Sequence, residues 1–187
     1  MNILFISATT IECDNERWVG DYPIHTIGVG KLSSSFHTQK LIHKYRPQLV
    51  INFGSCGTTQ KDLEIGVPYE VGTVYQDIDT RPIGSYGTIP YTNTGKLVIS
   101  DSPYRLFTTD TFYDNSRTDY SIPYLKSVQQ HHFIDMEGYS IAYTCQQLNT
   151  PLRMFKWVSD DGDVAQWKEN AQLGFQKFTQ IIRNDYL

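Results

Sequence analysis

Two acidic motifs in the last third of the chain have the residue types that acid–base chemistry requires. Asp135-Met136-Glu137-Gly138 precedes a helix-like pattern, and Asp160, 23 residues after Glu137, ends a strand-like apolar run. One such carboxylate can accept hydrogen bonds from ligand hydroxyl groups, and another can donate a proton. A proton on Asp160 at neutral pH requires a pKa raised by burial or by like charge, and Asp161 and Asp163 lie nearby.

The elements that must position these acids alternate along the chain, which predicts an α/β fold. We expect one domain over residues 1–187, with a mixed, mostly parallel central sheet and helices on both faces. Apolar runs predict strands at 3–8, 23–29, 49–53, 68–75, 96–100, 105–109 and 152–158. Helical spacing predicts helices at 32–45, 139–148 and 164–182. In the first helix, Leu32 and Phe36 are expected on the same side as Ile42, and Pro47 follows its end.

Composition limits the classes of partner. The chain has 187 residues, of which 40% are hydrophobic and 19% charged, so we expect a folded domain. The net charge of −4 and the absence of a long basic run argue against a nucleic-acid partner. The apolar stretches are too short to span a membrane. Cys13, Cys56 and Cys145 lack Cys-x-x-Cys spacing, so we expect reduced thiols and a cytoplasmic location.

Two glycine-containing segments follow predicted strands. Gly54-Ser55-Cys56-Gly57 is expected to form a tight turn at the carboxyl end of a strand, where open α/β sheets bind ligands. Gly28-Val29-Gly30-Lys31 lies between a strand and a helix but lacks the third glycine of a dinucleotide fingerprint. Each segment is also compatible with an ordinary turn, and for the 28–31 segment taken alone the ordinary turn is favoured. Residues 77–94 are expected to form a long loop.

Several single residues have both a functional and an ordinary interpretation. Glu12 follows the first predicted strand, where most glutamates are only solvated, and Phe112 could stack on a planar ligand or pack in the core. Cys56 has no identifiable base nearby, so we do not expect a nucleophile. His131 and His132 are adjacent and would point to opposite faces of a strand. We therefore predict neither a metal site nor a cofactor.

In chain order, these segments resemble the nucleoside phosphorylase/nucleosidase superfamily. Within it they are most similar to the 5′-methylthioadenosine/S-adenosylhomocysteine nucleosidases, with futalosine hydrolase a close relative. The matching segments are 3–12, 28–31, 47–57, 75–80, 108–113 and 134–163. The resemblance implies an enzyme that hydrolyses the N-glycosidic bond of a purine nucleoside of the adenine type. It also implies a small-molecule substrate and a homodimer.

The resemblance also implies roles for the acids. Glu12 falls on the carboxylate that activates water, and Asp160 falls on the general acid that protonates the purine ring at N7. Met136 and Glu137 fall on residues that hold the ribose hydroxyls. Cleavage of the C–N bond leaves positive charge on the sugar and negative charge on the base, so acids at both ends suit the reaction.

Four further residues take substrate-binding roles from the same resemblance. Ser55 matches a residue near the sugar and the water, and Phe112 matches the ring that stacks on the base. Tyr113 falls on the residue whose backbone meets the base edge. Ser159 belongs to the Ser-Asp pair that ends in the general acid.

Asn52 bears on the choice between water and phosphate as the nucleophile. Bacterial hexameric purine phosphorylases carry a phosphate-binding arginine at the matching position, and an oxyanion without basic partners is poorly held. We therefore expect hydrolysis. The alternatives are a phosphate-dependent phosphorylase, a futalosine hydrolase-like activity and a nucleoside-binding module without turnover. The chain is shorter than is usual in the family between residues 12 and 23 and between 90 and 108, which affects the pocket for the 5′ substituent.

Overall fold

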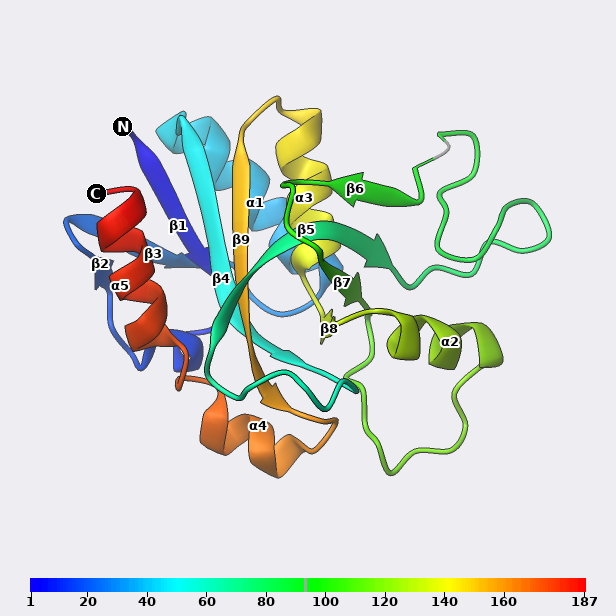
Figure 1. The fold of residues 1–187 in the computed structure, drawn as a ribbon. Helices are drawn as coiled ribbons and strands as arrows, with labels where there is room; N and C mark the ends of the chain where they lie inside the picture. Colours follow the sequence, from blue (N-terminus) through cyan, green and yellow to red (C-terminus); the bar gives the residue numbers. More distant parts are fainter. Residues whose placement is uncertain (93) are drawn as a thin grey trace.

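The computed structural model describes residues 1–92 and 94–187 and contains, within them, one sheet and five α-helices (Figure 1). The strands are β1 (Ile3–Ser7), β2 (Trp18–Val19), β3 (Tyr22–Thr26), β4 (Leu49–Gly57), β5 (Pro68–Gln76), β6 (Lys96–Val98), β7 (Tyr104–Thr108), β8 (Phe133–Asp135) and β9 (Leu152–Asp160). The helices are α1 (Lys31–Tyr45), α2 (Ile122–Gln130), α3 (Gly138–Gln147), α4 (Val164–Asn170) and α5 (Phe175–Asp185), with a short 3-10 helix η1 (Ile11–Cys13).

The sheet is mixed, and parallel pairs are the majority. β1 pairs in parallel with β3 and β4, β4 with β9, and β7 with both β5 and β8. The pairs β2–β3, β4–β8, β5–β6 and β5–β9 are antiparallel. The pairings β4–β8–β7–β5–β9–β4 form a closed circuit, which brings the carboxyl ends of β4, β8 and β9 together.

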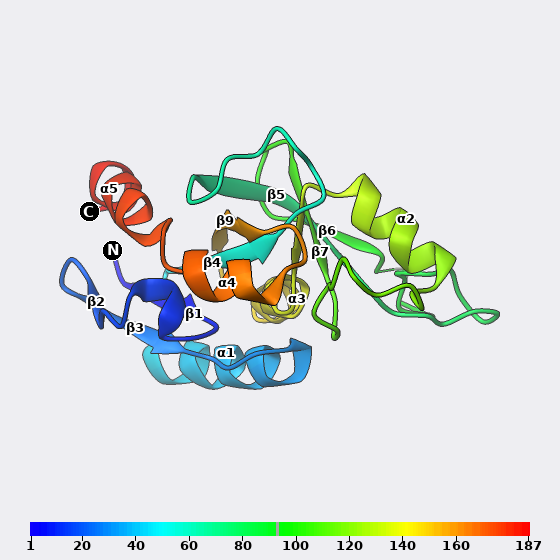
Figure 2. The same cartoon turned by 90° about the horizontal axis from the view of Figure 1, so that it is seen from below.

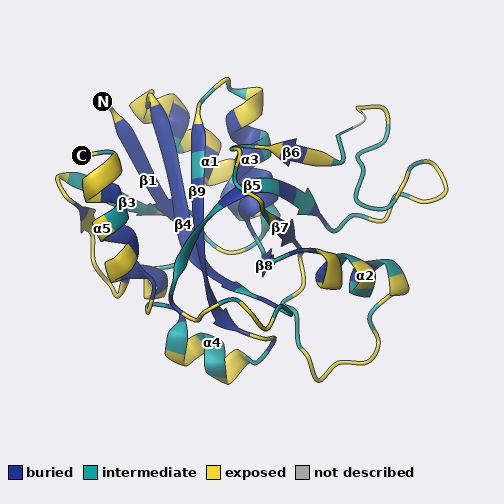
Figure 3. Cartoon of the chain, viewed as in Figure 1, coloured by how far each residue is buried: buried dark blue, intermediate teal, exposed yellow. Residues whose placement is uncertain are grey.

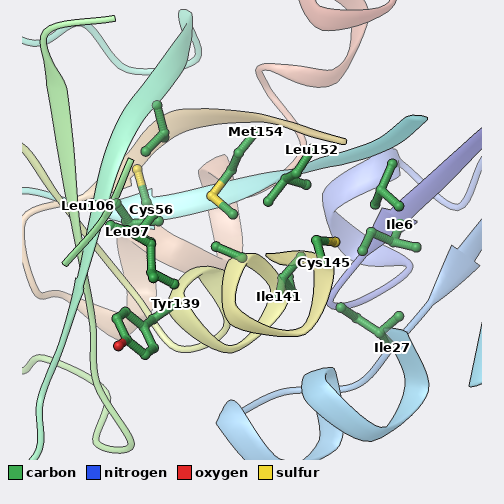
Figure 4. Packing of buried hydrophobic residues seen from close by; sticks show 14 of the residues in the cluster. Ile6, Ile27, Cys56, Leu97, Leu106, Tyr139, Ile141, Cys145, Leu152 and Met154 are labelled. Atoms are coloured by element: carbon green, nitrogen blue, oxygen red, sulfur yellow. The ribbon is translucent and has the colours of Figure 1, made fainter. Parts of the chain in front are cut away.

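Helices cover both faces of the sheet, as the sequence predicts (Figure 2). Successive side chains of a strand point to opposite faces, so β1 places Leu4 and Ile6 against α1 and α3, and Ile3 and Phe5 against α5. Both faces are therefore buried, which explains the continuous apolar runs in the central strands (Figure 3). On the α3 side, Ile141 and Cys145 pack against Ile6, Leu152 and Met154 (Figure 4).

Two predicted segments have a different structure from the one expected. Gly54 to Gly57 do not form a turn but continue β4, because this segment pairs with β9 from Gly54↔Lys156 to Cys56↔Val158. The predicted helix at 164–182 is two helices, α4 and α5. The second helix begins after Gly174, where an added Cβ would lie 2.2 Å from the Trp157 ring.

The predicted face of α1 is also wrong. Its buried residues are Ser34, Thr38 and Ile42, whereas Leu32 and Phe36 are 86% and 59% exposed. Small hydroxyl side chains let α1 pack closely on α3, and the Ser34 and Ser140 hydroxyl oxygens lie 2.6 Å apart.

Four elements, η1, β2, α2 and β8, have no counterpart among the sequence predictions. Apart from residue 93, which lies outside the described residues, the loop predicted at 77–94 contains turns, bends and one isolated bridge rather than a helix or named strand. None of the helices in the described part of the chain has both the length and the apolar character that a bilayer crossing requires.

Candidate active site

A cavity of about 200 Å³ lies where β1, β4, β7, β8 and β9 end. Its walls include seven of the predicted site residues, namely Glu12, Ser55, Phe112, Tyr113, Met136, Glu137 and Asp160. These residues come from five separate parts of the chain, so the fold brings together groups that the sequence only predicts to be related. Concave sites at the carboxyl ends of strands are where α/β proteins commonly bind small molecules.

Glu12 is buried in η1 and is held by four donors. Its Oε1 accepts hydrogen bonds from the backbone N–H of Ser55 at 2.9 Å and from the Ser55 hydroxyl at 3.0 Å. Its Oε2 accepts from the Ser7 hydroxyl at 2.8 Å and from the backbone N–H of Thr9 at 3.1 Å. These four donors hold both carboxylate oxygens and fix the orientation of the Glu12 side chain.

Gly54 makes the contact between η1 and β4 possible. A Cβ atom at this position would lie 2.5 Å from Oε1 of Glu12, which is closer than real Cβ atoms approach. The glycine in the middle of β4 is therefore explained by the close approach of the Glu12 carboxylate, and not by a turn.

Glu137 lies between β8 and α3 and is buried. Its Oε1 accepts a hydrogen bond of 2.9 Å from the backbone N–H of Gly30. The junction at 28–31 thus holds a carboxylate of the site, and Lys31 forms an ion pair of 2.9 Å with Asp110. Burial and the neighbouring Asp135 carboxylate raise the pKa of Glu137 above its ordinary range, although Lys156 acts in the opposite direction.

Lys156 is a residue that the sequence predictions missed. It lies in the middle of β9, is 1% exposed, and its Nζ lies 2.9 Å from Oδ2 of Asp135. Burial lowers the pKa of Lys156, but the carboxylates of Asp135, Glu137 and Glu12 raise it by more. The sequence did contain a signal for this ion pair, namely a lysine inside the apolar run 152–158. A lysine in a buried strand is almost always paired with an acid.

Asp135 connects Lys156 to the start of α3. Its Oδ2 also accepts from the backbone N–H of Gly138 at 2.8 Å, and its Oδ1 accepts from the Thr108 hydroxyl at 2.7 Å. A Cβ at position 138 would lie 2.3 Å from a Leu106 methyl group and 3.0 Å from Oδ2 of Asp135. In the sequence Asp-Met-Glu-Gly, the aspartate that ends β8 is therefore ion-paired, and the glycine lets α3 begin in close contact with its neighbours.

Asp160 ends β9 and faces the cavity. Burial raises its pKa, hydrogen bonds from Ser159 and Gly162 lower it, and the charges of Asp161 and Asp163 raise it further. The Ser159 hydroxyl donates to Oδ2 at 2.7 Å, and the Gly162 N–H donates to Oδ1 at 3.0 Å. The net shift is upward, which is the direction that a proton donor requires.

Ser159 is the one predicted site residue that does not line the cavity. Its side chain is fully buried and contacts Asp160 and the backbone carbonyl of Cys56. In this position it orients the acid and does not itself face a ligand.

Cys56 lines the cavity but has the properties of a structural thiol. Its Sγ donates to the Trp157 carbonyl at 3.4 Å, and burial raises its pKa well above the ordinary range. A thiol in this state is a poor nucleophile, in agreement with the prediction from sequence.

Aromatic side chains form another part of the wall. Phe112 meets Trp167 of α4 edge to face, with ring centroids 6.4 Å apart, and Tyr113 lies beside Phe112 in the wall. The sequence predictions assign Trp167 no role in the site, so its place in the cavity wall was missed.

The charged side chains of the described wall are acidic. Within residues 1–92 and 94–187, no arginine or lysine lines the cavity, and no cluster of His, Cys, Asp and Glu side chains could hold a metal ion. Asn52 is buried away from the cavity, and its Nδ2 donates to the Ile6 carbonyl at 3.2 Å.

Known proteins with related sequences share one description, although no protein-family model matches the chain. The 5′-methylthioadenosine/S-adenosylhomocysteine nucleosidase of Buchnera aphidicola is 31% identical over 88% of this chain and 83% of its own length. The nucleosidase of the same description from an Exiguobacterium species is 30% identical over 82% of this chain and 71% of its own length.

Solved structures of the same kind share the fold. The nucleosidase of Colwellia psychrerythraea, in complex with adenine, superposes with a TM-score of 0.83 at 20% identity, covering 98% of this chain and 93% of its own. The futalosine hydrolase of Helicobacter pylori gives a TM-score of 0.81 at 18% identity and covers 97% of each chain.

The buried ion pair predicts a large effect of Lys156→Met on stability. The substitution leaves the Asp135 carboxylate buried without its counter-charge, so the free energy of unfolding should fall by about 3–5 kcal/mol. Denaturant unfolding measures the loss, and Lys177→Met, at an exposed position on α5, is the matched control. Adding Asp135→Asn should recover part of the loss, and a single variant as stable as the wild type would contradict the pairing.

The raised pKa of Asp160 predicts that Asp160→Asn does not weaken the fold at neutral pH. A carboxyl whose pKa is higher in the folded than in the unfolded state loses stability as pH rises through the folded pKa. The asparagine removes this cost, and its amide can donate to Ser159 while Ser159 donates to the Cys56 carbonyl. Thermal unfolding should give a midpoint at least as high as that of the wild type at pH 7. The difference should shrink below about pH 4, and a lower midpoint at pH 7 would contradict this account.

Proposed function

The chain belongs to the 5′-methylthioadenosine/S-adenosylhomocysteine nucleosidase family, and we propose that it hydrolyses the N-glycosidic bond of an adenine-type nucleoside such as 5′-methylthioadenosine or S-adenosylhomocysteine. The products are the free base and the ribose derivative. The observation that carries this proposal is the convergence of Glu12, Glu137 and Asp160 on one cavity.

The three carboxylates differ in environment, and the differences suit different tasks. Glu12, held by four donors, is oriented to accept a proton from water that attacks the sugar. Glu137, with the backbone of Met136 beside it, binds the ribose hydroxyls. Asp160, with its raised pKa, protonates the leaving base. Environments that separate the proton affinities of two carboxyls are a general way to obtain an acid and a base in one site.

The aromatic wall suits the base. Phe112 offers a ring face for stacking, and the backbone of Tyr113 offers hydrogen-bonding groups to the base edge. Ser159 contributes by holding Asp160 in place.

Water, and not phosphate, is the proposed nucleophile. Phosphate needs cationic or other strong donors, and the cavity wall in the described part of the chain contains no basic side chain. Lys31 and Lys156 are paired with Asp110 and Asp135.

Incubation with a panel of nucleosides tests the proposal. The purified protein would be mixed with methylthioadenosine, adenosylhomocysteine, adenosine, inosine and futalosine, each with and without inorganic phosphate, and the products separated by chromatography. Free adenine should appear from the adenine nucleosides at the same rate with and without phosphate. Strict phosphate dependence with ribose 1-phosphate as product would indicate a phosphorylase, and no free base from any nucleoside would rule out the enzyme.

A homodimer and a cytoplasmic location complete the proposal. Val29, Leu32 and Phe36 are exposed at the start of α1, and Val29 also lines the cavity, so a second copy on this face would lie beside the site. Cys13, Cys56 and Cys145 are all free and buried, which suits a reducing compartment.

The dimer predicts a response to Leu32→Asp. A charge in the centre of an apolar interface should dissociate the dimer to monomers, as measured by light scattering during size-exclusion chromatography. Ile122→Asp, at another exposed apolar position, on α2, is the control and should leave the mass unchanged. A monomeric wild-type protein would exclude the dimer.

A further inference from the structure

Trp167 contacts the network that holds Glu12. The indole Nε1–H of Trp167 donates a hydrogen bond of 3.2 Å to the Ser55 hydroxyl oxygen. That hydroxyl in turn donates to Oε1 of Glu12 at 3.0 Å. The indole also lines the cavity and meets Phe112 edge to face.

The direction of this chain of hydrogen bonds is fixed by chemistry. An indole N–H can only donate, and a serine hydroxyl has one proton to give. When Trp167 occupies an acceptor position of the Ser55 hydroxyl, the hydroxyl proton is directed to Glu12. Without the indole N–H, the same hydroxyl could rotate toward other acceptors.

The Ser55 hydroxyl is the donor to Glu12 whose orientation depends on Trp167. Of the four donors to Glu12, two are backbone groups, and the Ser7 hydroxyl lies outside the cavity wall. The Ser55 hydroxyl is the remaining donor, and Ser55 lines the cavity together with Glu12.

Helix α4 holds Trp167 firmly against β9. The Asp163 side chain caps the start of α4 by accepting from the backbone N–H of Ala165 at 2.7 Å. At the other end, the Asn170 amide donates to the Ser159 carbonyl at 2.9 Å, and the Trp157 indole donates to the Ala171 carbonyl at 2.8 Å. The strand that carries the acid therefore also fixes the residue that reaches toward Glu12.

We propose that Trp167 is a positioning residue for the hydrolysis, acting through the Ser55 hydroxyl to orient the Glu12 carboxylate; this inference rests on the proposed function. Trp167 couples the α4 side of the cavity to Glu12, which activates the water. Its N–H, and not only its ring, contributes to turnover.

A double-mutant cycle tests the proposal. Trp167→Phe keeps a ring beside Phe112 but removes the N–H, so kcat should fall roughly three- to tenfold, as for one lost neutral hydrogen bond, with KM changed by less than about twofold. In a Ser55→Ala background the same substitution should have no further effect on kcat. Trp18→Phe, at an exposed position outside the cavity, is the matched control and should leave both constants unchanged.

A second measurement does not depend on activity. In a ¹⁵N NMR spectrum, the Trp167 indole N–H signal, assigned by its loss in Trp167→Phe, should move on Ser55→Ala, while the signal of Trp18, which is exposed and outside the cavity wall, stays in place. An unmoved Trp167 signal, or an undiminished kcat in a folded Trp167→Phe protein, would overturn the inference. So would equal effects of Trp167→Phe with and without Ser55. No turnover by the wild type would instead overturn the proposed function, and this inference with it.

Discussion

The structure depends on burying four carboxylates around one cavity without leaving any of them unsatisfied. Glu12, Asp135, Glu137 and Asp160 are all buried, and Lys156 is the one buried cation in the described part of the chain. An uncompensated buried charge costs several kcal/mol, so each carboxylate needs its own solution. Asp135 forms an ion pair with Lys156, and Glu12 accepts hydrogen bonds from four donors. Glu137 accepts a hydrogen bond from one backbone N–H. Asp160 accepts hydrogen bonds from two donors, and its pKa is raised.

These different environments give the carboxyl groups different orientations and different pKa values. The carboxylate with the most donors is the best oriented, whereas burial and nearby like charges raise the pKa of both Glu137 and Asp160 and so favour a bound proton. Glycines at 54 and 138 allow the carboxylates to approach the backbone closely, because a Cβ at either position would collide with the site. The same packing that closes the sheet circuit therefore also sets the chemistry of the cavity.

The sequence was sufficient for the features that depend on local pattern. The alternation of strands and helices and the positions of Glu12, Glu137 and Asp160 at element ends could be read from it, with roles supplied by family resemblance. Features that depend on tertiary pairing could not. Gly54 to Gly57 look like a turn, but pairing with β9 keeps them extended, and the Trp157 ring separates α4 from α5 at Gly174. The partner of Lys156 and the contact of Trp167 with Ser55 join residues 21 and 112 positions apart, beyond the reach of any periodicity.

The central claim is that Asp160 donates the proton to the leaving base from within the cavity it shares with Glu12 and Glu137. The most direct measurement is the turnover of Asp160→Asn on methylthioadenosine at pH 7, with the substrate affinity measured in parallel. General acid catalysis contributes ~100- to 10,000-fold, so kcat should fall by that amount while binding is largely kept. Near-native turnover in the folded variant would contradict the account and place the acid elsewhere.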